Sequence, residues 1–232
     1  MTPIYVAIDT PDIHRAAAIA REVRGVAAGL KLGLEFFCAH GDNGVLRLAE
    51  REMPIFLDLK LHDIPNTVKK AVAALAHLRP AILTVHASGG QEMMAAAKEA
   101  APANTKVVAV TVLTSLDRED LFRMGVDYSP ASQVDRLTHL AAESGVDGIV
   151  CSGAEVGRAR GVWPEGFLIV PGLRPAGAEL GDQKRTVTPA EASAAGASAL
   201  VIGRPITESI NPRRAIMDIV ASLEQTPRET RY

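Results

Sequence analysis

The sequence predicts an α/β protein built as a single (β/α)8 TIM barrel that spans residues 1–232. Eight short apolar runs, most of them rich in Val, Ile and Leu, recur along the chain. Near-continuous runs of this kind are typical of parallel strands that are covered on both faces. Amphipathic segments with helical spacing separate the runs, and no stretch has the composition of a linker between two domains.

The expected strands are spaced so that a helix fits between neighbours. Their ranges are 4–9, 29–34, 55–60, 81–87, 106–114, 148–152, 167–172 and 199–203. The main alternative is an open doubly wound sheet, whose first strand should be followed by a G-x-G-x-x-G turn. The segment from Ala7 to Ala16 is AIDTPDIHRA and contains no glycine, which favours the closed barrel.

Several helices are predicted by their first residues and by their apolar spacing. Three expected helices start with a capping residue followed by proline, at 129–130, 188–189 and 211–212. Thr188 and Glu191 also have the spacing of a capping box. The expected buried faces are Val68, Val72, Leu75 and Ala76; Val134, Leu137, Leu140 and Ala141; and Ile216, Ile219, Val220 and Leu223.

Composition and charge restrict the classes of partner. Hydrophobic residues make up 47% of the chain, and 25 basic residues against 27 acidic ones give a net charge of −2. Without a basic excess we expect neither nucleic acid nor an anionic membrane as a partner. The N-terminal segment does not resemble a signal peptide, and no apolar window is long enough for a transmembrane helix. We expect a cytoplasmic location, with Cys38 and Cys151 as small buried residues in a reducing environment.

Charged residues gather where the third apolar run ends. The segment PIFLDLKLHDIPNTV, residues 54–68, begins as a buried strand and then places Asp58, Lys60, His62 and Asp63 within six positions. Strand side chains alternate between faces, so Asp58 and Lys60 should both face the barrel mouth. Other expected strand ends carry Asp9, Lys31, His86, Thr114, Ser115, Arg174 and Arg204. Active sites of this fold lie at these strand ends.

A layer of ion pairs that closes the barrel is the structural alternative for these charges, because structural networks also perturb pKa values. A candidate phosphate site favours catalysis instead. Gly203 and Arg204 follow the last strand, where barrels of this type often hold phosphate. The loop from Arg174 to Arg185 follows the seventh strand and has the composition of a lid.

Taken together, these segments resemble the orotidine 5′-phosphate decarboxylase family. The family motif, Asp-x-Lys-x-x-Asp followed by Pro-Asn-Thr, is complete in DLKLHDIPNTV, residues 58–68. Further similar segments are AID, LKLG, VTVLTS, PGLRP, GDQKR and VIGRPIT, which occur in order over essentially the whole chain. The resemblance implies conversion of orotidine 5′-monophosphate to UMP and CO2 in de novo pyrimidine biosynthesis, with neither a metal nor a cofactor.

The resemblance also implies the roles of individual residues. Lys60 would be the proton donor within a charged network that includes Lys31, Asp58 and Asp63. Asp63 and Thr67 would reach the neighbouring subunit's site in a homodimer. Asp9 and Lys31 would bind the ribose hydroxyls, Thr114 and Ser115 the pyrimidine, and Pro171, Arg174, Gln183, Gly203 and Arg204 would line the phosphate side.

The chemistry of such a decarboxylation explains why charges are needed. Loss of CO2 from C6 of the pyrimidine leaves a carbanion that has little resonance stabilisation. The ammonium group of Lys60 would stabilise this charge and then protonate C6. Asp58 would repel the departing carboxylate, and the alternation of positive and negative side chains would keep each of them ionised.

Two alternative functions are considered beside the decarboxylase, and two histidines near the site are given structural roles. Metal-dependent relatives, such as hexulose-phosphate synthases and sugar-phosphate decarboxylases, share the motif but have an acidic residue where this chain has Lys31. A non-catalytic binder of a phosphorylated ligand is the second alternative. We expect His62 to pack near its strand end and His86 to be a hydrogen-bonded core residue, so neither is assigned a catalytic role.

Overall fold

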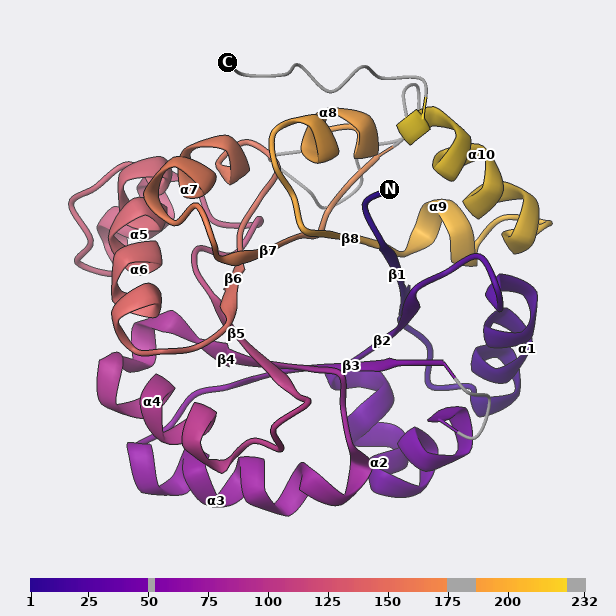
Figure 1. Cartoon of the computed structure of the whole chain (residues 1–232), viewed down its shortest axis with the longest axis horizontal. Coiled ribbons are helices and arrows are strands. Elements are labelled where there is room, and N and C mark those ends of the chain that lie inside the picture. The colour runs from indigo at the N-terminus through magenta and orange to yellow at the C-terminus, as the bar shows by residue number, and fades with distance from the viewer. Residues whose placement is uncertain (50–52, 175–186, 225–232) are drawn as a thin grey trace.

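Eight parallel strands close into one barrel, with the helices arranged around it (Figure 1). The computed structural model describes residues 1–49, 53–174 and 187–224. Each strand pairs with the next along the chain, and the first pairs with the last. This arrangement confirms the predicted (β/α)8 barrel.

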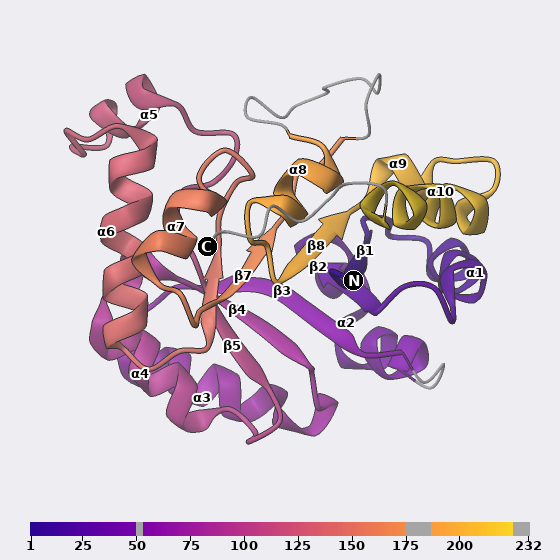
Figure 2. The ribbon, with the colours of Figure 1, turned by 45° about the horizontal axis from the view of Figure 1, so that its top comes forward.

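The strands and helices alternate along the chain. The strands are β1 (Ile4–Ile8), β2 (Gly29–Gly33), β3 (Ile55–Leu61), β4 (Ile82–His86), β5 (Lys106–Val110), β6 (Gly148–Val150), β7 (Phe167–Val170) and β8 (Ala199–Ile202). The helices are α1 (Ile13–Val23), α2 (Leu34–Ala49), α3 (Pro65–Leu75), α4 (Gln91–Ala100), α5 (Arg118–Arg123), α6 (Pro130–Glu143), α7 (Val156–Val162), α8 (Pro189–Ala194), α9 (Arg204–Thr207) and α10 (Pro212–Glu224). Two short 3-10 helices, η1 (Ala76–Leu78) and η2 (Ala87–Gly89), flank β4. The tilted view shows α9 beside α10 and α10 near α1, so the last helices close the ring (Figure 2).

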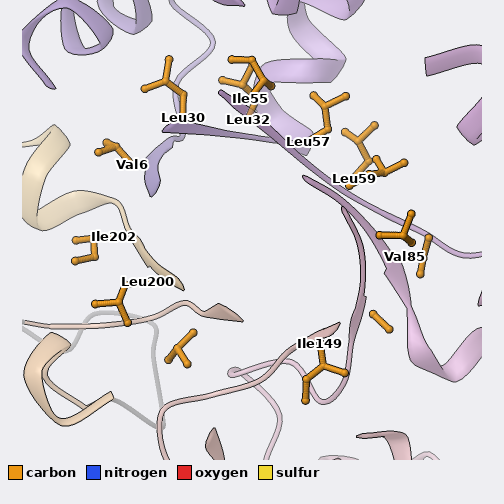
Figure 3. Packing of buried hydrophobic residues seen from close by; sticks show 14 of the residues in the cluster. Val6, Leu30, Leu32, Ile55, Leu57, Leu59, Val85, Ile149, Leu200 and Ile202 are labelled. Atoms are coloured by element: carbon orange, nitrogen blue, oxygen red, sulfur yellow. The ribbon is translucent and has the colours of Figure 1, made fainter. Parts of the chain in front are cut away.

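Side-chain alternation divides the core into two layers. Residues such as Val6, Leu30, Leu57 and Ile202 point from the strands toward the helices and form the larger layer (Figure 3). The smaller layer fills the barrel interior and consists of Ala7, Phe56, Ile82, Val108, Ile169, Ala199 and Val201. The interior is therefore packed, and a site can form only above this layer.

The predicted helix starts are confirmed at three positions. The side chain of Ser129 accepts a hydrogen bond from the amide of Ser132, and Thr188 and Glu191 form a capping box. Asn211 accepts from the amide of Arg214 at the start of α10. The apolar faces follow the predicted spacing, except that Ala76 begins η1 rather than continuing α3.

Two expectations from the sequence were wrong in detail. Cys38 is exposed, because it lies on α2 on the side away from the fully buried Phe36, whereas Cys151 is buried as expected. β5 ends at Val110 rather than at Thr114, since the chain leaves the ladder and turns over the barrel mouth. Among the described helices, none combines the length and apolar character needed to cross a membrane.

Candidate active site

A cavity of about 420 Å³ opens at the carboxyl ends of the strands. Its apolar floor is the top of the barrel interior, with side chains from Ala7, Phe56, Val110, Val150, Ile169 and Val201. Its polar lining comes from Asp9, Lys31, Asp58, Lys60, Thr114, Arg174, Arg204 and Glu208. Such an arrangement suits a ligand with an apolar ring at one end and charged groups at the other.

A carboxylate held between two ammonium groups lies at one side of this cavity. The Nζ atom of Lys60 is 2.8 Å from Oδ1 of Asp58, and the Nζ atom of Lys31 is 3.2 Å from Oδ2. Lys31 also lies 3.5 Å from Oδ1 of Asp9 at the end of β1. Lys31 and Asp58 are each only 9% exposed, so salt and water screen these charges far less than surface charges.

The pKa of Asp58 reflects two opposing effects. Burial by itself would raise this pKa, because it disfavours the charged carboxylate. The ammonium groups of Lys31 and Lys60 outweigh burial, and the pKa of Asp58 lies below its usual value. Asp58 is therefore ionised at neutral pH, and one negative charge stands between two positive groups.

Lys60 reaches the cavity through a bulge in β3. The ladder with β4 pairs Leu57 with Leu83 and resumes at Leu61 with Val85, so three residues of β3 lie opposite one of β4. Lys60 has a φ of 51°, in the left-handed region that costs a non-glycine residue about 1–2 kcal/mol. Asp58 and Lys60 do share the cavity as predicted, but simple strand alternation does not explain why.

Thr84, which lies opposite this bulge, was not predicted from the sequence as a site residue. Its side chain is fully buried, and its hydroxyl contacts both Asp58 and the backbone amide of Lys60. The available signal was a single hydroxyl residue inside the apolar run AILTV, residues 81–85. Cys151 and Glu208 were also not assigned to the site, although both line the cavity.

The expected phosphate side lies at the ends of β7 and β8, and β8 pairs with β1. Gly172, with a φ of 73°, turns the chain after β7, and Arg174 follows it. Gly203 and Arg204 follow β8, and Pro171 lies with these four residues along the cavity wall. The two arginines bring positive charge to one rim, where paired guanidinium groups suit phosphate oxygens. Gln183, predicted for the same side, and most of the expected lid lie outside the described residues.

Asp63 and Thr67 are placed apart from the cavity of their own chain. Both are exposed, and neither lines the cavity. The Oδ1 atom of Asp63 accepts a hydrogen bond of 2.7 Å from the amide of Ile64, and no ion pair joins it to another described residue. Ser115 is likewise exposed and lies outside the cavity wall that includes Thr114. One chain therefore brings together three members of the predicted four-residue network.

The two histidines near β3 and β4 contact each other. Their ring centroids are 5.5 Å apart, and neither ring lines the cavity. His86 is half-buried rather than in the core as expected, because β4 ends there and its ring meets the exposed His62. Burial, with smaller contributions from His62 and Lys60, lowers the pKa of His86 below its usual value. His86 is therefore neutral at pH 7.

The described residues offer few possible metal ligands in one place. In residues 1–49, 53–174 and 187–224, no three or more His, Cys, Asp or Glu side chains are grouped so that they could hold a metal ion.

The fold and the charged strand ends together define the class: a (β/α)8-barrel enzyme with its site at the carboxyl ends of the strands.

Comparisons with known proteins narrow this class to one family. The model of the Orotidine 5'-phosphate decarboxylase / HUMPS family matches residues 2–219. The orotidine 5'-phosphate decarboxylase of Sphingopyxis alaskensis is 59% identical over 222 residues, which cover 96% of this chain and 99% of the relative. The protein of the same name from Novosphingobium aromaticivorans is 58% identical and covers 95% of this chain and 99% of its own length. The chain belongs to the Orotidine 5'-phosphate decarboxylase / HUMPS family.

The solved structures agree with this assignment. The crystal structure of orotidine 5'-phosphate decarboxylase from Lactobacillus acidophilus superposes with a TM-score of 0.84 at 35% sequence identity. The match covers 96% of this chain and 99% of that one. The barrel described above is therefore the fold of this relative as well.

Proposed function

We propose that this chain is an orotidine 5′-phosphate decarboxylase, a carboxy-lyase that converts orotidine 5′-monophosphate to UMP and CO2 without a metal or a cofactor. The observation that carries the proposal is the position of Lys31 and Lys60 on the two oxygens of Asp58. Curated relatives that are 56–59% identical carry the name of this enzyme, which supports the assignment.

The cavity accommodates the parts of this substrate in a consistent order. The phosphate binds at the rim formed by Pro171, Arg174, Gly203 and Arg204. The resemblance adds Gln183, which lies outside the described residues. The ribose hydroxyls bind Asp9 and Lys31, which lie 3.5 Å apart and already form an ion pair. The pyrimidine lies over the apolar floor, with Thr114 at its polar edge. The resemblance assigns Ser115 to the same edge, although Ser115 lies outside the cavity wall. C6 of the pyrimidine then faces Lys60.

The proposed reaction uses the charged side chains at one side of the cavity. The bond between C6 and the carboxylate carbon breaks, CO2 leaves, and the electron pair stays on C6. The ammonium group of Lys60 lies close to this developing charge and stabilises it electrostatically. One proton then passes from Lys60 to C6 to give UMP, and Lys60 regains a proton from water.

Asp58 and Lys31 prepare this step. Asp58 is ionised and buried, so a substrate carboxylate placed beside it is repelled, and its loss as neutral CO2 relieves the repulsion. Lys31 neutralises part of the same charge from the far oxygen and keeps Asp58 from taking a proton. The pair of lysines also argues against the metal-dependent members of the family, because ammonium groups already occupy both oxygens that a cation would need.

Completion of the site requires a second copy of the chain in this proposal. Asp63 and Thr67 are exposed and outside the cavity of their own chain, which suits residues that reach a partner's site. The active form is then a homodimer. A single domain over residues 1–232 and a cytoplasmic location remain predictions from the sequence.

The direct test is the change in ultraviolet absorbance when orotidine 5′-monophosphate is mixed with the purified protein. We expect the absorbance of the substrate to fall as UMP forms, with one CO2 released per UMP. Binding of UMP without any turnover would instead support the non-catalytic binder. Turnover of a sugar phosphate that depends on Mg²⁺, with none of orotidine 5′-monophosphate, would support the metal-dependent relative.

A further inference from the structure

Thr84 is the third residue of β4 and lies beneath the charged residues of the cavity. Its side chain is completely buried, and it does not line the cavity. Its Oγ1 atom lies 3.1 Å from Oδ1 of Asp58. The same Oγ1 atom lies 2.9 Å from the backbone nitrogen of Lys60.

The directions of these two hydrogen bonds follow from chemistry. A backbone amide can only donate, so the hydroxyl accepts from Lys60 and keeps its own proton for Asp58. The ionised carboxylate of Asp58 can only accept. The single hydroxyl therefore connects the backbone of one residue of the charged pair to the side chain of the other.

The bulge in β3 makes this connection necessary. Between Leu57 and Leu61 the regular pairing with β4 is interrupted, so the amide of Lys60 has no place in the ladder. A buried amide without an acceptor is costly, and Thr84 supplies the acceptor from the one residue of β4 that faces the bulge. The hydroxyl thus holds Lys60 at a φ of 51°, a conformation that an L-residue rarely adopts without support.

We propose that Thr84 is a positioning residue that holds the amine of Lys60 at Oδ1 of Asp58. The Thr84 hydroxyl fixes the backbone of Lys60, and it also fixes the Asp58 oxygen that the Lys60 amine contacts. Oδ1 of Asp58 receives both the hydroxyl of Thr84 and the Nζ atom of Lys60. The expected effect of Thr84 on kcat rests on the proposed function. The expected effect of Thr84 on the position of Lys60 does not.

Three substitutions of Thr84 distinguish the effect of its hydroxyl from the effect of its branched shape. Thr84→Val keeps the branched shape and removes the hydroxyl, Thr84→Ser keeps the hydroxyl, and Thr84→Ala is a smaller substitute if valine hinders folding. Thr105→Val is the matched control. The Thr105 hydroxyl is also buried, but it donates to the carbonyl of Pro80. Thr105 lies just before β5, at the end of the barrel away from the cavity.

Crystal structures of the variants test the proposal without any reference to activity. In Thr84→Val we expect Lys60 to leave the left-handed conformation, or its Nζ atom to move away from Oδ1 of Asp58 by about 1 Å or more. Thr84→Ser and Thr105→Val should retain both features. An unchanged Lys60 backbone and an unchanged contact with Asp58 in Thr84→Val or Thr84→Ala would overturn the proposal.

Kinetics with orotidine 5′-monophosphate then measure the effect on the reaction. We expect kcat of Thr84→Val to fall about ten- to a hundredfold, with KM changed much less, because a displacement of about 1 Å misplaces the proton donor. Thr84→Ser should lie within a fewfold of the parent, and Thr105→Val should be unchanged. A rise in KM with an unaltered kcat would contradict a positioning role.

The crystal structures and the kinetic measurements together distinguish failure of this proposal from failure of the proposed function. If the parent protein decarboxylates nothing while Thr84→Val shifts Lys60, the positioning role stands and the proposed function is wrong. If the parent is active and Thr84→Val retains its structure and its kcat, the positioning role is wrong and the proposed function stands.

Discussion

The Nζ atom of Lys60 lies 2.8 Å from Oδ1 of Asp58, which is two positions earlier on the same strand. In a regular strand, two residues at this spacing point the same way from pleats about 7 Å apart. The bulge and the left-handed backbone of Lys60 allow the amine to turn back onto the carboxylate. In the proposed function, this cation and this anion both act on the carboxylate of the substrate.

Lys60→Ala should abolish turnover and leave the barrel folded. The substitution removes the proposed proton donor, and general acid help contributes about 10²–10⁴ in rate before the electrostatic share is counted. Activity is measured by the absorbance assay and folding by circular dichroism. Lys69→Ala is the control, since Lys69 pairs with Glu99 on the surface and should be dispensable. Near-normal turnover in folded Lys60→Ala would refute the assigned role.

Activity should survive exhaustive treatment with EDTA. Asp58 already has Lys60 on one oxygen and Lys31 on the other, so a divalent cation would have to displace an ammonium group to bind there. Turnover before and after chelation, with and without added Mg²⁺, is the measurement. Activity that disappears with EDTA and returns with Mg²⁺ would favour the metal-dependent relatives.

Arg204→Ala should lower kcat/KM severely. In the proposed complex the phosphate would lie away from the reacting bond, so its binding energy could stabilise the transition state rather than only the bound substrate. Added guanidinium should restore part of the loss. Arg214→Ala on α10 is the control, because Arg214 is exposed and pairs with Asp218. If Arg204→Ala behaves like the parent, the phosphate binds elsewhere.

Mixing two inactive variants should restore activity if the sites are shared. Lys60→Ala and Asp63→Ala are each expected to be badly impaired as homodimers. Random exchange makes about half of the dimers mixed, and each mixed dimer has one intact site, so activity should rise toward about a quarter of the parent level.

The control for this mixture pairs Lys60→Ala with the double variant Lys60→Ala/Asp63→Ala, in which no site can have Lys60. It should remain inactive under the same exchange conditions. If mixing the single variants gives no gain while subunit exchange is confirmed by an independent label, Asp63 acts within its own chain.

The free energy of unfolding should depend on pH through His86. The folded protein lowers the pKa of His86, mainly by burial and further through His62 and Lys60, while Asp58 acts in the opposite direction. The unfolded chain therefore binds this proton more readily, and stability falls as the pH drops through and below the ordinary histidine pKa of about 6.5. His86→Asn should reduce this loss, as measured by urea denaturation between about pH 5 and 8. His139→Asn on the exposed face of α6 is the control, and equal slopes for both variants would refute the assignment.

The barrel and most of the charged site could be predicted from the amino-acid sequence alone. Apolar runs, capping residues such as Ser129 and Thr188, and strand-end charges such as Asp58 are local patterns. Local patterns suffice because strand and helix periodicity, together with the rule that barrel sites lie at strand ends, convert them into positions.

The contact between Lys60 and Asp58 depends on how β3 pairs with β4, which the sequence does not show. The bulge in β3 and its bond to Thr84 depend on the register between two strands, which are 26 residues apart at the Thr84–Asp58 contact. The exposure of Cys38 and the exclusion of Asp63 from its own cavity depend on packing in the same way. No periodicity within one segment encodes these features, because each arises from the hydrogen bonds and burial that a neighbouring segment provides.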